Sequence, residues 1–509
     1  MSGAVSTPHP LATAAGMQVL RAGGTAPEAL IAAGAVLAVV MPHFCGLGGD
    51  AVWLVAPAKG AARSFLAIGQ GLDRTFPAGP IPLRGPQSVL TSAAVVAGWA
   101  HALDFARAQL GGRAQWHDLL APAIDHADTG FAVTPSQEFW SRFRAQEAVS
   151  WPGFAALYMN NGQPLQAGAL LRQQGLAHSM RALAEDGAQT FYQGGLSRQI
   201  VDGLRAAGVQ ISQQDLARTS CRDARPLSLS YRGMTLLAPP PPTQGLTTLQ
   251  IMGQLRALDL TRMQAGSADH IHLCVEAVKR AFLQRGQIAD PAAHAMDTDR
   301  HLDPARLDGW AQDISMSHAL PWPHVWAHGD TVFLGAIDEM GNAASVLQST
   351  YFDWGSGVVA GDTGIVWQNR GAAFSADPAH VNAFAPGKLP FYTLNPGMAL
   401  KDGVPKLVYG TQGADGQPQT LAMLLTRMID FGQSPPDALA GPRFLLGRTF
   451  SDSRDSLKLE GDVSTHTRSE LAARGHEISL IPAQSPMAGL AGVVQSGADG
   501  LHAWHDPRV

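Results

Sequence analysis

Residues 331–350 constrain the fold most, because they predict a β-hairpin that is buried on both faces. The run TVFLGAI, residues 331–337, is apolar throughout, whereas a strand with one face in water alternates apolar and polar residues. The segment DEMGN, residues 338–342, has the composition of a turn, and residues 343–350 read as the return strand. Such a hairpin lies inside a large folded body, with packed structure over each face of its sheet.

The turn also predicts a register for the hairpin. If the strands flank the turn symmetrically, Ile337 faces Ala343, and counting back along both strands brings Thr331 opposite Ser349. Directly opposed residues have Cβ atoms about 4.5–5.5 Å apart, so the two hydroxyls would lie within hydrogen-bonding reach. A slip of one residue would separate them.

Thr331 follows Gly-Asp directly and has two readings. As a β-branched residue it suits the first position of a strand after a turn. Alternatively, the chain cuts itself before Thr331, and the new N-terminal amine activates the side-chain hydroxyl as a nucleophile. An α-amino group has a pKa of about 7.7–8.0, so it can act as the general base for its own hydroxyl near neutral pH.

Composition indicates a large compact protein. The 509 residues can hold two or three ordinary domains or one large domain, and only 15% are charged, against about a quarter in an average soluble protein. A low charged fraction fits a body with little surface per residue. The net charge of −5 comes without a basic stripe, so nucleic acid is not an expected partner.

Cysteine usage and hydropathy give an expected location. Cys45, Cys221 and Cys274 are widely spaced and odd in number, which argues against a disulfide framework or a zinc site. The N-terminus lacks a signal-peptide pattern, and the longest apolar run, residues 29–41, is too short to span a bilayer. We therefore expect a soluble cytoplasmic protein that does not contact a membrane.

The remaining segments predict a mixture of helices and strands. Residues 9–24 and 25–41 read as helices, the second with the capping-box spacing of Thr25 and Glu28, and residues 51–56 read as a strand. Residues 95–325 are expected to be mainly helical. The segment APPPPTQG, residues 238–245, is expected to be a rigid extended loop, because consecutive prolines suit neither a helix interior nor a central strand.

Several catalytic motifs are absent from the sequence. There is no HExxH or Cys/His spacing for a metal, no GxxxxGK[ST] phosphate loop and no GxSxG nucleophile elbow. These exclusions favour a self-contained nucleophile that needs no cofactor.

Nine motifs follow one another along nearly the whole chain. The opening segment HPLATAAGMQVLRAGGTAPEALIAAGAVLAVVMPHFCGLGGDAVWLV is followed in order by VVAGW, APPPPTQG and EAVKRAFLQR. GDTVFLGAIDEMGNAASVLQSTY comes next, and GSGVVAGDTGIVWQNRG, PGKLPFYTLNP, LVYGTQGADGQPQT and GPRF follow it. In this order the motifs resemble those of the γ-glutamyltranspeptidase family of N-terminal-nucleophile hydrolases, and the segment that contains Thr331 is similar to the processing site of the family.

The resemblance implies a fold and a cut. The fold would be a four-layer αββα sandwich of the α/β (α+β) class, in which two antiparallel sheets lie between helical layers. The precursor would cleave itself between Asp330 and Thr331 into pieces 1–330 and 331–509, which remain together as a heterodimer in one αββα domain. Whether such heterodimers pair further is open.

The resemblance also implies catalytic roles for particular residues. Thr331 would be the nucleophile, and Ser349 matches the hydroxyl that supports it. Gly413 and Ala414 fall at the paired glycines whose N–H groups form the oxyanion hole, and alanine keeps the N–H that the second position requires.

The substrate pocket departs from the family pattern. Positions that hold the γ-glutamyl amino group as an asparagine, a glutamine and an aspartate are here Tyr351, Arg370 and Ala373. The arginine that pairs with the α-carboxylate falls near Leu66, and the two serines on that carboxylate become Tyr392 and Thr393. A pocket without the aspartate and with an added arginine disfavours an ammonium group.

The pattern therefore predicts a substrate that is a small acid without an amino group, with Arg370 on its carboxylate or, alternatively, in a structural ion pair. The motifs are most similar to the branch with oxamate amidohydrolases, although Leu389 and Tyr392 replace residues usual there. The leading hypothesis is a self-processing amidohydrolase of a small carboxylate-bearing amide. A γ-glutamyl hydrolase or acyltransferase with an altered pocket and a non-catalytic relative are the alternatives.

Overall fold

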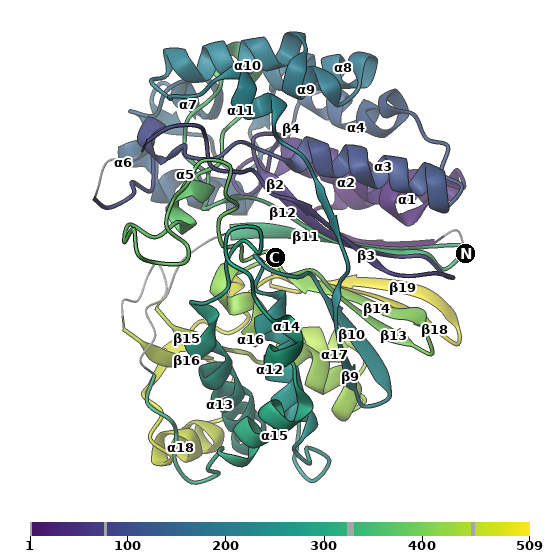
Figure 1. Ribbon diagram of the computed structural model, residues 1–509, viewed down its shortest axis with the longest axis vertical. Coiled ribbons are helices and arrows are strands. Elements are labelled where there is room, and N and C mark those ends of the chain that lie inside the picture. Colours follow the sequence, from purple (N-terminus) through teal and green to yellow (C-terminus); the bar gives the residue numbers. More distant parts are fainter. Residues whose placement is uncertain (1–2, 76–78, 323–329, 449–453, 509) are drawn as a thin grey trace.

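The computed structural model of the protein describes residues 3–75, 79–322, 330–448 and 454–508. Two six-stranded antiparallel sheets lie face to face between layers of helices (Figure 1). The strand order of the first sheet is β1 (Gly3–Ser6), β11 (Asp330–Asp338), β12 (Ala343–Tyr351), β2 (Asp50–Ala56), β3 (Arg63–Ala67) and β8 (Arg222–Ala224). That of the second is β19 (Gly500–His505), β18 (Ala491–Gly497), β14 (Val404–Thr411), β13 (Gly397–Lys401), β10 (Met234–Ala238) and β9 (Leu227–Tyr231).

The helices divide between the two outer faces (Figure 1). The first sheet is covered by α1 (Pro10–Arg21), α2 (Ala26–Val40), α3 (Val95–Gln109) and α4 (Trp116–Thr129), with α5 (Pro135–Phe143), α6 (Ala145–Ala148), α7 (Phe154–Tyr158), α8 (Gln174–Asp186), α9 (Gln189–Gln193), α10 (Gly195–Ala206) and α11 (Gln213–Ala217) around them. The second is covered by α12 (Gly245–Arg256), α13 (Ala268–Arg285), α14 (Thr298–His301), α15 (Pro304–Gln312), α16 (Gln417–Leu425), α17 (Pro435–Ala440) and α18 (Thr465–Ala473). A small sheet of β15 (Phe444–Gly447), β16 (Ser456–Glu460) and β17 (Ile478–Ile481) joins the second layer, while β4 (Phe131–Ala132) pairs with β7 (Leu170–Leu171) and β5 (Met159–Asn160) with β6 (Gln163–Pro164).

Three apolar cores fill the three spaces between these four layers. One core, with Trp53 and Trp99, joins the first sheet to its helices, and a second, with Ile251 and Val275, does so for the second sheet. The third lies between the sheets and includes Phe333 from β11. The four-layer αββα sandwich expected from the sequence is therefore confirmed.

Close approaches between layers place the central hairpin. A Cβ on Gly34 of α2 would lie 2.6 Å from Oε1 of Gln348, so this glycine lets the helix reach β12. On the other face, the Phe333 ring occupies the space where Cβ atoms of Gly410 and Gly492 would be. The hairpin is thus held from both sides, as its apolar sequence predicts.

The register of the hairpin follows the prediction for most of its length and then departs. Pairs run from Ile337↔Ala343 to Val332↔Gln348 as expected, but the register shifts there, and Asp330 aligns with Tyr351. Two residues of β12 therefore stand opposite the single residue Thr331. The prediction that Thr331 alone directly faces Ser349 is wrong, because a β-bulge interrupts the ladder at the end of the hairpin.

The segment expected to be mainly helical also contains β8, β9 and β10. In β9 the sequence LSLSY alternates between exposed serines and buried or half-buried apolar residues, which is the period of a strand with one face in water. The proline segment is a tight turn that leads directly into α12 at Gly245, and it is less extended than expected.

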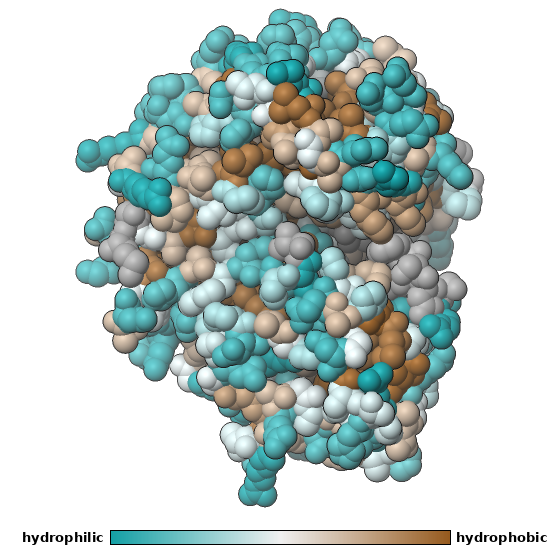
Figure 2. All heavy atoms as spheres, turned by 180° about the vertical axis from the view of Figure 1, so that it is seen from behind, coloured by the Kyte–Doolittle hydropathy of each residue, from teal (hydrophilic) through white to brown (hydrophobic). Residues whose placement is uncertain are grey.

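Among the described residues, no helix is long and apolar enough to cross a membrane. On the face of the molecule in Figure 2, hydrophilic side chains cover much of both helical layers, and hydrophobic residues appear in separate groups.

Candidate active site

Thr331 is buried near the start of β11, which lies between β1 and β12 in the first sheet. Its side chain and backbone together are 1% exposed. The next strand, β12, carries Ser349, whose Oγ accepts a hydrogen bond from the Tyr351 N–H at 2.8 Å. The bulge therefore brings the predicted nucleophile, Ser349 and Tyr351 to one end of the hairpin.

Arg370 lies in η3 (Arg370–Ala373), fully buried between two tyrosine rings. The centre of its guanidinium group is 3.7 Å from the Tyr351 ring and 3.6 Å from the Tyr392 ring. Within the described parts of the chain, its Nε, Nη1 and Nη2 atoms have no hydrogen-bond partner. The rings cover both flat faces of the guanidinium group, so only its in-plane N–H groups remain for a partner.

Asp50 lies next to this stack and was not among the residues predicted from the sequence. It is aligned with Ser349 across the β2–β12 ladder, and its Oδ2 accepts a hydrogen bond from the Tyr392 hydroxyl at 3.0 Å. Its Oδ1 accepts from the N–H groups of Gly69 and Ala94, each at 2.9 Å. Burial nevertheless raises the pKa of the Asp50 carboxyl to about 6, because desolvation outweighs these hydrogen bonds.

The predicted oxyanion loop follows the end of β14. Gly413 has φ 115° and Ala414, the first residue of η4 (Ala414–Gly416), has φ 44°. Alanine rarely adopts a left-handed conformation, and such strain clusters at functional sites. Tyr351, with φ 84°, is a second such residue of this site. Among the described residues, the N–H groups of Gly413 and Ala414 donate no hydrogen bond, so both are free to receive an oxyanion.

Gln244, at the end of the proline segment, connects the loop to the pocket. Its Nε2 donates to the carbonyl of Thr393 at 2.6 Å and to that of Ala414 at 2.7 Å. Thr393 is buried, with 2% of its surface exposed, and its carbonyl accepts this hydrogen bond from Gln244. The sequence signal that could have revealed Gln244 is a glutamine placed between a proline turn and an apolar helix, where its amide has to find partners inside the protein.

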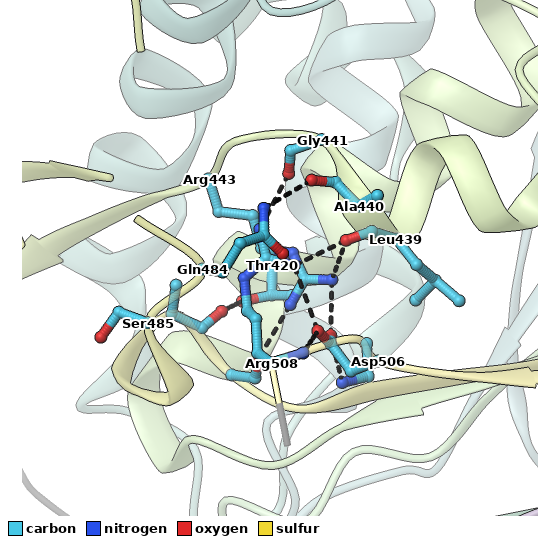
Figure 3. Close-up of polar contacts among 12 residues, drawn as sticks. Thr420, Leu439, Ala440, Gly441, Arg443, Gln484, Ser485, Asp506 and Arg508 are labelled. Carbon is cyan, nitrogen blue, oxygen red and sulfur yellow. Dashed lines mark hydrogen bonds and ion pairs between the residues drawn. The ribbon is translucent and has the colours of Figure 1, made fainter. Parts of the chain in front are cut away.

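Arg443, Asp506 and Arg508 form a buried ion cluster (Figure 3). The Arg443 side chain pairs with Asp506 at 2.6 Å and donates to the Gly489 carbonyl at 2.8 Å. Gly489 lies beside Gly413, whose hypothetical Cβ would be 3.7 Å from the Gly489 Cα. Arg508, near the C-terminus, pairs with Glu460 at 2.6 Å in the same cluster.

Side chains of the kinds that bind metal ions also lie close together in one cluster. Among the described residues, His272, Glu276 and His476 offer ligand atoms within 4.8 Å of one another. The Glu276 carboxylate already pairs with Lys279 and Arg280, each at 2.9 Å, and the two histidine rings are hydrogen-bonded at 2.8 Å. Two cations on the single carboxylate oppose a third, so these contacts fit a structural polar cluster.

The contacts therefore link Tyr351, Arg370, Tyr392 and Thr393, the residues predicted to bind the substrate. Thr331 lies beside Ser349 and Tyr351, Tyr351 stacks on Arg370, and Arg370 stacks on Tyr392. Thr393 follows Tyr392 in the chain and shares Gln244 with Ala414. A buried threonine at the start of a sheet strand in an αββα sandwich, with Ser349 on the neighbouring strand, is the arrangement expected of the N-terminal-nucleophile hydrolases.

Comparisons with known proteins give the family within this class. The model of the family described as Gamma-glutamyltranspeptidase matches residues 12–509, and the chain belongs to that family. The chain is 41% identical to the oxamate amidohydrolase proenzyme of Klebsiella pneumoniae subsp. pneumoniae, over 99% of this chain and 97% of that one. It is 37% identical to the glutathione hydrolase-like YwrD proenzyme of Bacillus subtilis, over 99% and 96%.

A solved structure has a similar fold. The crystal structure of the cephalosporin acylase from Bacillus halodurans has a TM-score of 0.90 and 30% sequence identity, covering 100% of this chain and 94% of that one. Since these relatives are named as an amidohydrolase, a hydrolase-like protein and an acylase, the chain is an amide hydrolase.

Proposed function

We propose that the chain cuts itself between Asp330 and Thr331 and that Thr331 then hydrolyses the amide of a small carboxylate-bearing substrate such as oxamate. The two pieces, residues 1–330 and 331–509, stay together as one αββα domain. The name of the 41% identical relative supports this substrate class.

The unpartnered guanidinium group of Arg370 is the observation that carries the proposal. A fully buried arginine with three unpaired nitrogens is unfavourable by several kcal/mol unless a ligand completes it. Because tyrosine rings cover its faces, the ligand has to approach in the guanidinium plane, and a carboxylate matches that edge with two parallel hydrogen bonds. The alternative of a structural ion pair lacks a partner among the described residues.

The proposed reaction assigns a role to each of these groups. The Thr331 amine takes the proton of its own hydroxyl as Oγ1 attacks the amide carbon, and the oxyanion accepts hydrogen bonds from the Gly413 and Ala414 N–H groups. The C–N bond breaks, and the amine passes its proton to the departing nitrogen, which leaves as ammonia. Water, activated by the same amine, attacks the ester, releases the acid and restores the threonine.

The pocket offers little to a γ-glutamyl ammonium group. Asp50 is an acidic residue beside the stack, but its oxygens already accept from two backbone N–H groups and from Tyr392. Asp415, whose charge also acts on Tyr351, is already paired with Arg285. Ala373 stands where the family has an aspartate. An ammonium group would therefore face Arg370 without an anion of its own, which is unfavourable in a closed site.

Processing is tested on a denaturing gel with N-terminal sequencing. The wild-type protein should give two bands, the smaller beginning Thr-Val-Phe-Leu, and Thr331→Ala should stay as one band. Ser345→Ala is the matched control, because this buried hydroxyl of the same hairpin bonds the Tyr409 carbonyl instead. Splitting of Thr331→Ala at this bond would contradict the assignment of the nucleophile.

The substrate class is tested by incubating the processed protein with oxamate, a glutaryl amide and a γ-glutamyl anilide. Oxamate and the glutaryl compound, which lack the amino group, should have the higher kcat/KM. Faster turnover of the γ-glutamyl compound would overturn the proposal for the pocket and favour a glutathione hydrolase, as the second relative is named.

A further inference from the structure

Both ends of the Gln244 side-chain amide are hydrogen-bonded inside the protein. Nε2 donates to two carbonyls, those of Thr393 and Ala414, and Oε1 accepts from Arg285 Nη1 at 3.4 Å. The residue is 0% exposed, and its own N–H donates to the Tyr392 carbonyl at 2.9 Å. Gln244 therefore holds Tyr392 through its backbone N–H, and Thr393 and the oxyanion loop through its side chain.

Arg285 fixes this amide and the loop from a second direction. Its guanidinium group pairs with both carboxylate oxygens of Asp415, at 2.6 and 2.7 Å, and lies over the Phe282 ring at 4.5 Å. Asp415 directly follows Ala414 in the chain. The peptide groups on the C-terminal side of Ala414 are thus held by Gln244 and by Arg285.

These contacts act on a conformation that the chain does not favour by itself. Ala414 has a left-handed backbone, and the direction of its N–H depends on the torsions of Gly413 and Ala414. A residue held in such a conformation persists only where its surroundings over-determine it. The hydrogen bond from Gln244 to the Ala414 carbonyl, together with the Arg285–Asp415 pair, supplies that restraint.

The restraint also comes from the other side of the proposed cut. Gln244 and Arg285 lie before residue 330, whereas Thr393, Ala414 and Asp415 lie after it. Neither piece by itself therefore contains both the oxyanion donors and the groups that aim them.

We propose that Gln244 is a positioning residue for catalysis. It orients the Ala414 N–H toward the oxyanion and fixes the position of this N–H relative to Tyr392 and Thr393. This inference rests on the proposed function for its kinetic readout. It has a second readout that does not involve a substrate.

The kinetic experiment replaces Gln244 with methionine, which has a similar shape and no donor. Removal of one oxyanion donor typically lowers kcat by about 10²–10³-fold, and misalignment should lower it by roughly 10–100-fold with KM within about threefold. Gln254→Met is the matched control, because Gln254 is also 0% exposed and donates to two carbonyls, those of Gln250 and Ala277, away from the site. A fall in kcat of equal size in both variants, or none in Gln244→Met, would overturn the proposal.

The second readout is amide hydrogen exchange, measured by mass spectrometry on peptides that cover residues 411–416. Exchange there should become faster in Gln244→Met and stay unchanged in Gln254→Met, whether the protein is processed or not. Unchanged exchange in both would contradict the inference. If the wild-type protein hydrolyses none of the amides, the proposed function fails, and the exchange result still decides the role of Gln244.

Gln244→Glu serves if the methionine variant does not fold. A buried glutamate that takes up a proton can donate to one carbonyl, whereas its ionised form can donate to neither. The ratio of its kcat to that of the wild-type protein should therefore rise as pH falls. A ratio that is constant with pH would oppose the positioning role.

Discussion

Arg370 combines a charge, full burial and two covered faces, and these properties set what its replacement should do. In Arg370→Met the kcat/KM for oxamate should fall by about 10²–10³-fold, mainly through KM, because two charge-assisted hydrogen bonds to the substrate are lost. The folded protein should be equally stable or more stable by roughly 1–3 kcal/mol, because an unpaired buried charge is removed. Steady-state kinetics and urea unfolding measure the two effects.

Arg443→Met is the control for this prediction. Arg443 is equally buried, but it is paired with Asp506 at 2.6 Å, so its loss should leave a buried carboxylate and lower stability. Equal losses of stability in both variants would show that Arg370 has a structural partner.

Asp50 predicts a pH dependence in the binding of anions. Its pKa is raised from 3.8 to about 6, so the carboxyl is neutral below pH 6 and becomes an anion near Arg370 and Tyr392 above it. The inhibition constant of a small unreactive carboxylate should therefore increase roughly three- to tenfold between pH 5 and pH 7. In Asp50→Asn this rise should disappear; a wild-type rise that persists in the variant would locate the titration elsewhere.

The raised pKa of Asp50 also makes the stability of the folded protein depend on pH. Since the pKa of Asp50 is higher in the folded protein than its ordinary value, the group favours folding most below about pH 4. That contribution is lost as pH rises through about 6. Ionised Asp50 is thus tolerated at the site at some expense of stability, as functional residues often are.

At the scale of elements, the C-terminal segment after β19 anchors the loop beside the oxyanion residues. Arg508 and Glu460 are each 0% exposed in their side chains, and Arg508 also donates to the Leu439 carbonyl at 2.6 Å. Arg508→Ala should lower the free energy of unfolding by about 3–5 kcal/mol, because it leaves a buried carboxylate unpaired. Arg142→Ala, which breaks an ion pair whose arginine side chain is 61% exposed, should change it by less than about 1 kcal/mol. Urea unfolding compares the two, and equal effects would contradict the role of burial.

The sequence predicted the helices and strands near the nucleophile better than the bulge and the long-range contacts of the site. The capping box of Thr25 and Glu28 and the register from Val332 to Ile337 are present as predicted, because both depend on neighbours in the chain. The bulge at Thr331 has no signal in the apolar pattern, since a period of two does not encode an extra residue. Asp50 and Gln244 were missed for a related reason: their partners, Tyr392, Thr393 and Ala414, come from more than 140 residues away.

At the scale of the whole molecule, both sheets mix strands from the two sides of the proposed cut. In the first sheet, β11 pairs with β1 and β12 pairs with β2, so the hairpin that begins at the nucleophile lies between strands of the preceding piece. In the second, β13 pairs with β10. The small piece therefore completes both sheets and cannot leave without breaking their ladders.

Unfolding should consequently depend on concentration only after the cut. The processed protein unfolds into two chains, so a hundredfold increase in its concentration should raise the midpoint temperature by about 2–3 °C. Uncut Thr331→Ala unfolds into one chain and should show no such change. Calorimetry on both forms measures this, and identical behaviour would mean that the pieces are still joined.

The insertion of the hairpin between β1 and β2 has a further outcome for a population of these molecules. After the proposed cut, each molecule should keep the piece with which it was translated, because exchange would require breaking the β1–β11 and β12–β2 ladders at once. Two differently tagged versions made in the same cell should therefore yield no hybrids. A defect in one piece should therefore affect only the molecules that were translated with it.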